Sequence, residues 1–74
     1  MPPRRLSHAQ IAEDLSARID AGEYKVGDKL PSYAELAAIY SVSVATIQRA
    51  LALLRHTGVV EGVAGVGVFV ARRR

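Results

Sequence analysis

The order of apolar and polar positions along the chain predicts three amphipathic helices followed by a short β-rich segment. In the first helix, over roughly residues 7–21, Ile11, Leu15 and Ile19 recur every four residues and form one apolar stripe. A Ser-x-x-Gln capping box opens this helix, and Gly22 directly after it is typical of a C-terminal cap. The spacing therefore predicts a helix that buries one face.

Two shorter helices are predicted over roughly residues 33–40 and 44–56, with a polar break between them. Ser32 opens the first of them in a second capping box, and Ser43 is placed to cap the other. Two helices joined by a short turn form a helix-turn-helix, whose second helix can enter the major groove of DNA.

The hydrophobic period changes after Gly58, which is expected to end the third helix. β-forming residues punctuated by glycines then predict a hairpin over about 59–62 and 67–71. The predicted fold is mainly α with a small β-hairpin: a winged helix-turn-helix, three helices followed by a two-stranded wing. Its core is expected to contain Ile11, Leu15, Ile19, Leu30, Leu36, Ile47, Leu51, Leu54, Val60 and Phe69.

The ends of the chain differ in composition from the rest. Two prolines and two arginines near the N-terminus indicate a flexible basic arm over residues 1–6, ahead of a single domain over 7–71. Three arginines form a basic tail over residues 72–74. The arginines of the arm and the tail either add non-specific attraction to phosphates or remain free in solution.

Composition and residue types exclude several classes of protein. The chain has no cysteine, so disulfides and thiolate metal sites are excluded. No run approaches the roughly 18 apolar residues that cross a bilayer, and no secretory segment follows Met1, so a cytoplasmic location is expected. His8 and His56 have no third ligand, and no group of residues suggests catalysis. We therefore expect neither an enzyme nor a metal or cofactor.

Charge is distributed unevenly between the two halves of the chain. Residues 1–35 carry five basic and six acidic side chains, a net charge of −1, whereas residues 36–74 carry five basic and one acidic side chain, a net charge of +4. The basic half contains the second helix of the helix-turn-helix, which suits a polyanionic partner. Surface arginines that only keep the domain soluble would give the same balance.

The order of short motifs over about residues 8–70 resembles the N-terminal DNA-binding domain of the GntR family of bacterial transcription regulators. That family's pattern is I-x-x-G-x-Y/L, P-G-D-x-L-P-S, E-L-A, V-S-x-x-T-V/I, A-L-x-x-L, G and G-x-G-x-F/Y-V. The resemblance implies a winged helix that binds specific DNA, either as a piece of a regulator with a C-terminal effector and dimerisation domain or as a stand-alone domain. The matching residues are Ile19, Gly22, Tyr24, Gly27, Asp28, Leu30, Pro31, Ser32, Glu35, Leu36, Ala37, Val42, Ser43, Thr46, Ile47, Ala50, Leu51, Leu54, Gly58, Val59, Gly65, Gly67, Phe69 and Val70.

Several positions depart from the family pattern. Many members carry arginines that contact DNA where this chain has Ala34, Val44 and Gln48. Tyr33 stands where an acidic residue is usual, and Val26 stands where proline is common. We therefore expect this domain to read a different base sequence from those members, or to bind DNA more weakly.

The start of the 44–56 helix carries side chains suited to reading DNA. Gln48 can form two hydrogen bonds with adenine, and Arg49 can contact guanine or a phosphate. The hydroxyls of Ser43 and Thr46 can reach a phosphate or a base edge, or can serve only as helix caps.

Further candidates lie beside them. Val44 and Ala45 can touch a thymine methyl group. Ser32 and Tyr33 begin a helix whose free amides attract phosphate, and the Tyr33 hydroxyl either joins them or belongs to a half-buried aromatic ring. Gly65 lets the wing tip approach DNA closely, although a tight turn alone would also require it. The predicted DNA-binding residues are Ser32, Tyr33, Ser43, Val44, Ala45, Thr46, Gln48, Arg49 and Gly65.

Two functions fit these features. The first is a sequence-specific, double-stranded DNA-binding transcription regulator, a repressor that binds as a homodimer to a two-fold symmetric site, because one small module buries little surface. The second is a winged-helix protein-interaction module with weakened DNA contacts, in which an exposed Val44-Ala45 step beside Leu53 forms the docking face.

Overall fold

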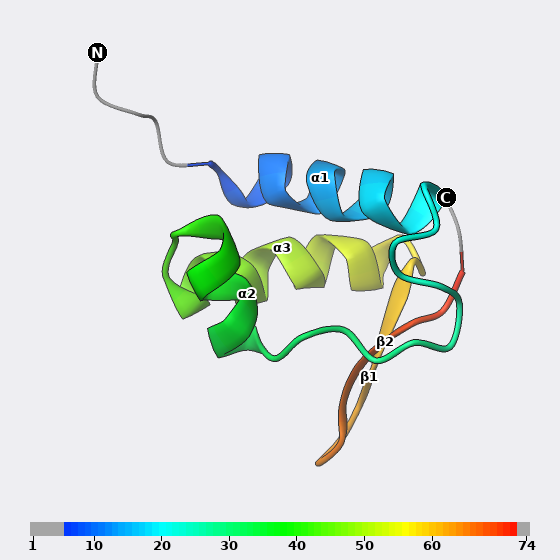
Figure 1. Cartoon of the computed structure of the whole chain (residues 1–74). Coiled ribbons are helices and arrows are strands. Elements are labelled where there is room, and N and C mark those ends of the chain that lie inside the picture. The colour runs from blue at the N-terminus through cyan, green and yellow to red at the C-terminus, as the bar shows by residue number, and fades with distance from the viewer. Residues whose placement is uncertain (1–5, 73–74) are drawn as a thin grey trace.

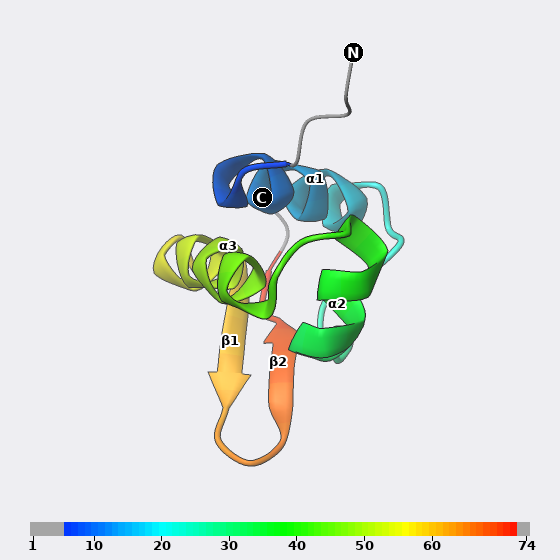
Figure 2. The same cartoon turned by 90° about the vertical axis from the view of Figure 1, so that its left-hand side faces the viewer.

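The computed structural model describes residues 6–72, and its elements follow the predicted order (Figure 1). The arm predicted over residues 1–6 and the tail predicted over 72–74 lie mostly outside the described residues. Helix α1 lies over α3, and the hairpin projects from α3 on the side away from α1 (Figures 1 and 2). The fold is a winged helix-turn-helix composed of α1 (His8–Asp20), α2 (Tyr33–Tyr40), α3 (Val44–His56), β1 (Val60–Val63) and β2 (Gly67–Val70).

Helix α1 begins and ends at the residues that the sequence indicates. The Ser7 amide donates to Oε1 of Gln10 at 2.8 Å, and the Gln10 amide donates to Oγ of Ser7 at 3.2 Å, which completes the capping box. Gly22 has φ +85°, and the Glu23 amide beyond it donates to the Arg18 carbonyl at 2.9 Å. This Schellman arrangement satisfies a terminal carbonyl and uses the left-handed conformation that glycine tolerates best.

The helix-turn-helix is formed by α2, a short turn and α3, whose axes are bent by 106°. Ser32 and Glu35 complete the capping box of α2. Ser41 ends α2 in the left-handed region, with φ 55° and its amide bonded back to α2. Ser43 then caps α3 by accepting from the Thr46 amide at 3.2 Å. Serines at both helix starts therefore determine where the chain turns.

The wing is an antiparallel pair in which Val60 lies opposite Val70 and Val63 lies opposite Gly67. The observed strands differ from the predicted ranges by about one residue at their ends. The hairpin turn occupies residues 64–66, and the Val66 amide closes it by donating to the Val63 carbonyl at 3.0 Å. The predicted hairpin with a glycine-containing tip is confirmed.

A segment that the sequence indicated only as a connection, residues 27–30, pairs along the free edge of β2. The Leu30 amide donates to the Val68 carbonyl at 2.8 Å, and the Val70 amide donates to the Asp28 carbonyl at 2.9 Å. This pairing covers the edge of the wing and holds the start of α2 close to β2.

The prediction that Phe69 belongs to the core is wrong. Phe69 is half-buried, whereas Val68 and Val70 on either side of it are 8% and 2% exposed. Side chains alternate between the two faces of a strand, and Phe69 shares its face with its partner Glu61. The other predicted core residues are buried: Ile11, Leu15, Ile19, Leu30, Leu36, Ile47, Leu51, Leu54 and Val60.

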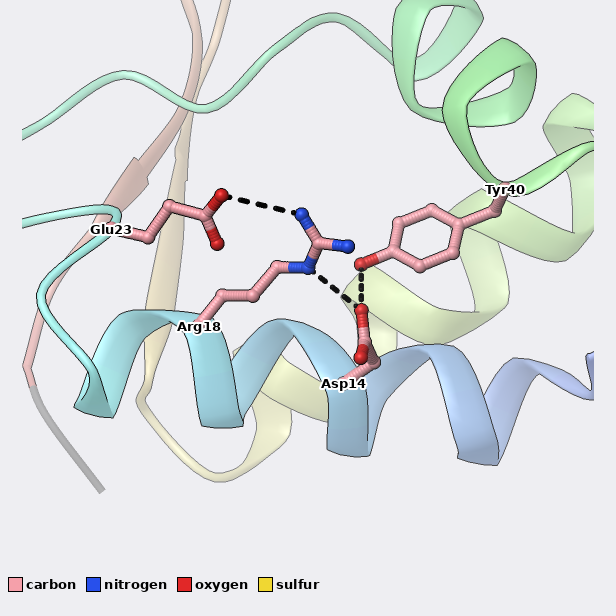
Figure 3. A network of polar contacts seen from close by, with 4 residues as sticks. All are labelled: Asp14, Arg18, Glu23 and Tyr40. Carbon is pink, nitrogen blue, oxygen red and sulfur yellow. Dashed lines mark hydrogen bonds and ion pairs between the residues drawn. The ribbon is translucent and has the colours of Figure 1, made fainter.

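A polar network joins α1 to the end of α2 (Figure 3). The Tyr40 hydroxyl donates to Oδ2 of Asp14 at 2.6 Å, and Nε of Arg18 donates to the same oxygen at 2.8 Å. The Arg18 guanidinium also lies 3.4 Å from Glu23 and 5.6 Å from the Tyr40 ring centroid. The bond from Tyr40, followed by that from Arg18, lowers the pKa of the Asp14 carboxyl. Burial and the bond to Asp14 raise the pKa of the Tyr40 hydroxyl.

Within residues 6–72, no single helix is long and apolar enough to cross a membrane. Helices α2 and α3 meet that length and composition only when they are taken together across their bend. Leu36, Ile47 and Leu51 of this pair are fully buried in the core, whereas Ile39, Val44 and Leu53 are exposed.

Candidate nucleic-acid interface

The first turns of α3 present an uninterrupted exposed face. Val44 is 41% exposed, and Ala45, Gln48 and Arg49 are also exposed. Neither Gln48 nor Arg49 has a side-chain hydrogen-bond or ion-pair partner among the described residues. The Gln48 amide and the Arg49 guanidinium are therefore available to a ligand. The opposite side of α3 is buried and is formed by Ile47, Ala50, Leu51 and Leu54.

The two hydroxyls at the start of α3 are engaged with each other. Oγ of Ser43 lies 3.0 Å from Oγ1 of Thr46, and it also accepts from the Thr46 amide. Ser43 is exposed and Thr46 is half-buried. Their capping role is therefore present in the free protein, and a hydroxyl oxygen can still accept a further hydrogen bond there.

At the start of α2, the cap and the aromatic ring have different surroundings. Ser32 is exposed and its hydroxyl caps α2, while Tyr33 is half-buried against the core. The hydroxyl of Tyr33 accepts from Nη2 of Arg55 at 2.9 Å. Glu35 accepts from the Ser32 amide at 3.0 Å, and this backbone hydrogen bond lowers the pKa of its carboxyl.

The wing tip is open but uncharged. Gly65 has φ +73° and no atom within 4 Å of where a Cβ would lie, so both the turn and the close approach of another molecule are possible. Val63 and Val66 beside it are 43% and 53% exposed. The wing therefore offers backbone and methyl groups to a partner, and no cation at its tip.

A groove of about 800 Å³ separates the start of α2 from the wing and reaches the start of α3. Two cations, Lys29 and Arg55, line it together with mainly apolar side chains. It thereby joins predicted site residues from three elements, including Tyr33, Val44 and Gly65. Gln48 and Arg49 do not line this groove and lie on the adjoining exposed face of α3.

Sequence reasoning missed Arg55 and Lys29. Arg55 is seven residues after Gln48 and eleven after Val44, which places all three within about 40° on the α3 surface. This helical spacing could have identified Arg55. Lys29 could not be identified in the same way, because its position depends on the pairing of residues 27–30 with β2.

The expected docking face of Val44 and Ala45 beside Leu53 is wrong. Leu53 is 42% exposed, but it lines a second hollow of about 320 Å³ between α1 and the end of α3. Val44 instead lines the groove beside the wing. Leu53 follows Val44 by nine positions, which turns the helix by about half a circle and separates the two side chains.

The architecture and the exposed face of α3 define a class of protein, the winged helix-turn-helix DNA-binding domains of transcription regulators. A family model described as "Bacterial regulatory proteins, gntR family" matches residues 7–70. The chain belongs to this family.

Relatives and solved structures agree with this assignment. The Exu regulon transcriptional regulator of Escherichia coli K12 is 43% identical over 68 residues, which cover 92% of this chain and 26% of that protein. The histidine utilization repressor of Klebsiella aerogenes is 38% identical over 64 residues, which cover 86% of this chain and 27% of the repressor. The chain thus spans about a quarter of the length of these relatives.

The fold is also that of solved regulators. A GntR family transcriptional regulator from Listeria monocytogenes superimposes with a TM-score of 0.86 at 35% identity, covering 96% of this chain and 62% of that one. The DNA-binding domain of AraR, solved in complex with operator ORX1, gives a TM-score of 0.84 at 32% identity, covering 96% of this chain and 93% of that one.

Proposed function

We propose that this domain represses transcription by binding a specific double-stranded DNA operator with the exposed face of α3. The observation that carries the proposal is the availability of Gln48 and Arg49, which are exposed and unpartnered among the described residues at the start of the second helix of a helix-turn-helix. Recognition helices read base edges from this part of the helix. The AraR domain, which has the same fold and was solved in complex with an operator, supports DNA binding by this domain.

Each predicted contact has a role in this proposal. Gln48 donates to and accepts from adenine, Arg49 contacts guanine or a phosphate, and Val44 and Ala45 meet thymine methyl groups. The remaining contacts, which position the domain on the phosphates, come from Ser32, Tyr33, Ser43, Thr46 and Gly65.

Two copies of the domain are needed for useful affinity, because a single module of this size buries limited DNA surface. We propose that the copies bind as a homodimer to two half-sites related by two-fold symmetry. Bacterial DNA lies in the cytoplasm, so the proposed place of action is cytoplasmic. The bound domain represses by occluding the promoter or operator.

Selection of duplexes from a random pool, followed by mapping of protected bases, tests this function. We expect enrichment of one motif, protection in the major groove and an affinity that falls steeply with added salt. Absence of binding to any duplex at low salt would overturn the proposal and favour a protein-interaction module.

A further inference from the structure

The surface proposed to face DNA lacks cations at three positions where a cation could contact DNA directly. Ala34 at the start of α2 and Val44 and Gln48 on α3 carry no charge. The wing tip, residues 63–66, carries none either. A domain that binds a polyanion from this side must obtain its phosphate contacts from other residues.

Arg55 is placed to supply such a contact. It lies on the same stripe of α3 as Val44 and Gln48, and its guanidinium extends into the groove between α2 and the wing. Nη2 donates to the Tyr33 hydroxyl at 2.9 Å. A Cβ built on Gly62 of β1 would lie 3.6 Å from Cζ of Arg55, so the guanidinium rests against that part of the wing. Residues from α2, α3 and β1 thus meet at one charged group.

The charge on Arg55 is not neutralised by the protein. Among the described residues, no carboxylate lies within ion-pair distance of Arg55, whereas Arg18 is paired with Asp14 and Glu23. One of the guanidinium's five N–H donors is used on Tyr33, and the planar fork matches a phosphate. Because the phenol oxygen accepts from Arg55, its own hydrogen is free to donate to the same anion.

We propose that Arg55, positioned by Tyr33, contacts a backbone phosphate of DNA in the groove between α2 and the wing, and replaces the cations absent from positions 34, 44 and 48. Lys29 lines the same groove beside β2. Its Cε lies 2.7 Å from the position that a Cβ built on Gly67 would take. The occupant is the sugar–phosphate backbone, because the groove is continuous with the exposed face of α3 and its charged lining residues are both cations. This inference rests on the proposed DNA binding.

Arg55→Ala is the first test, measured by titrating the selected site and a random duplex at several salt concentrations. We expect about a tenfold loss of affinity on both duplexes and a salt slope lower by about one. Arg55→Lys should keep the slope while losing part of the affinity, because the charge remains and the fork does not. Lys25→Ala removes an exposed cation that does not line the groove, and serves as the matched control with unchanged affinity.

The positioning role of Tyr33 is tested by a double-mutant cycle. Tyr33→Phe should weaken DNA binding in the wild-type background and have little further effect in the Arg55→Ala background. Thermal melts of the same variants report whether the fold is intact. Wild-type affinity and slope for Arg55→Ala would overturn the proposal, as would a loss confined to the selected site, which would make Arg55 a base reader. If the wild-type domain binds no duplex, the proposed function itself fails.

Discussion

At the scale of single residues, Gln48 differs from its neighbours because its amide offers a donor and an acceptor together. Its exposed position on α3 leaves both available. Val44 and Ala45 can contribute only apolar contact, and Arg49 contributes only donors. Base selectivity should therefore depend on Gln48 more than on any other side chain of this face.

Gln48→Ala is expected to weaken binding to the selected site by about 1–3 kcal/mol and to leave binding to random duplex nearly unchanged, because a bidentate base contact is lost while phosphate attraction remains. Competition titrations with the two duplexes measure the difference. Equal losses on both would assign Gln48 to the DNA backbone. No loss on either, with an intact melt, would make Val44 and Ala45 the readers.

Arg49→Ala separates the two possible contacts of this arginine. If Arg49 binds a phosphate, its removal should lower the salt slope by about one and weaken binding to all duplexes alike. If it binds guanine, the loss should be largest on the selected site. Affinity measured across a salt series distinguishes these results, and unchanged affinity and slope would remove Arg49 from the interface.

At the scale of elements, the arrangement of α1 and α2 depends on polar as well as apolar contacts. The Tyr40 hydroxyl crosses from the end of α2 to Asp14 on α1, and Arg18 holds the same carboxylate (Figure 3). The network fixes the end of α2 just before the turn into α3. Its contribution should depend on the charge of Asp14.

Asp14→Asn is expected to lower the melting temperature at neutral pH and to have little effect in acid. The pKa of Asp14 in the folded protein lies below its unfolded value of about 3.9. The stability that the ionised carboxylate contributes is therefore fully present above the unfolded pKa, and it is lost as the pH falls through the folded pKa. Melts of wild type and variant over a pH series test this. The control is Glu61→Gln, which changes a carboxylate on the wing outside the network. A difference that persists unchanged in acid would contradict the prediction.

The wing shows how pairing between distant segments determines local burial. Alternation along β2 allows either Val68 and Val70 or Phe69 to face the helices, and the core predicted from the sequence includes Phe69. The pairing of β2 with β1 and with residues 27–30 places the two valines inward instead. A two-residue period predicts that the faces differ, and the neighbours of the strand decide which face is buried.

At the scale of the whole molecule, a small core limits stability. Leu51 on α3 is a fully buried member of the core cluster, whereas Leu53 on the same helix is 42% exposed. Leu51→Ala should lower the free energy of unfolding by about 2–5 kcal/mol through lost burial and a cavity. Leu53→Ala, the matched control, should cost much less. Chemical denaturation measures both, and a loss near zero for Leu51→Ala would show that this side chain is not part of the core.

Most of the fold and the exposed face of α3 could be predicted from the sequence, because they depend on short-range patterns. Serine caps, helical spacing and glycines with positive φ each act within a few residues, and the observed helix ends agree with them. The exposed positions of Gln48 and Arg49 follow from the same helical period. DNA contact at these positions remains a prediction.

The sequence by itself determined where each helix begins and ends, which side of each helix is buried and which family the chain resembles, since local hydrogen bonds and helical periodicity specify these features. Only the tertiary structure decided that residues 27–30 pair with β2, that Phe69 lies outside the core, and that Arg55 meets Tyr33 in the groove beside the wing. The physical reason is that these contacts join segments far apart in the chain. Their geometry is set by how whole elements pack against one another.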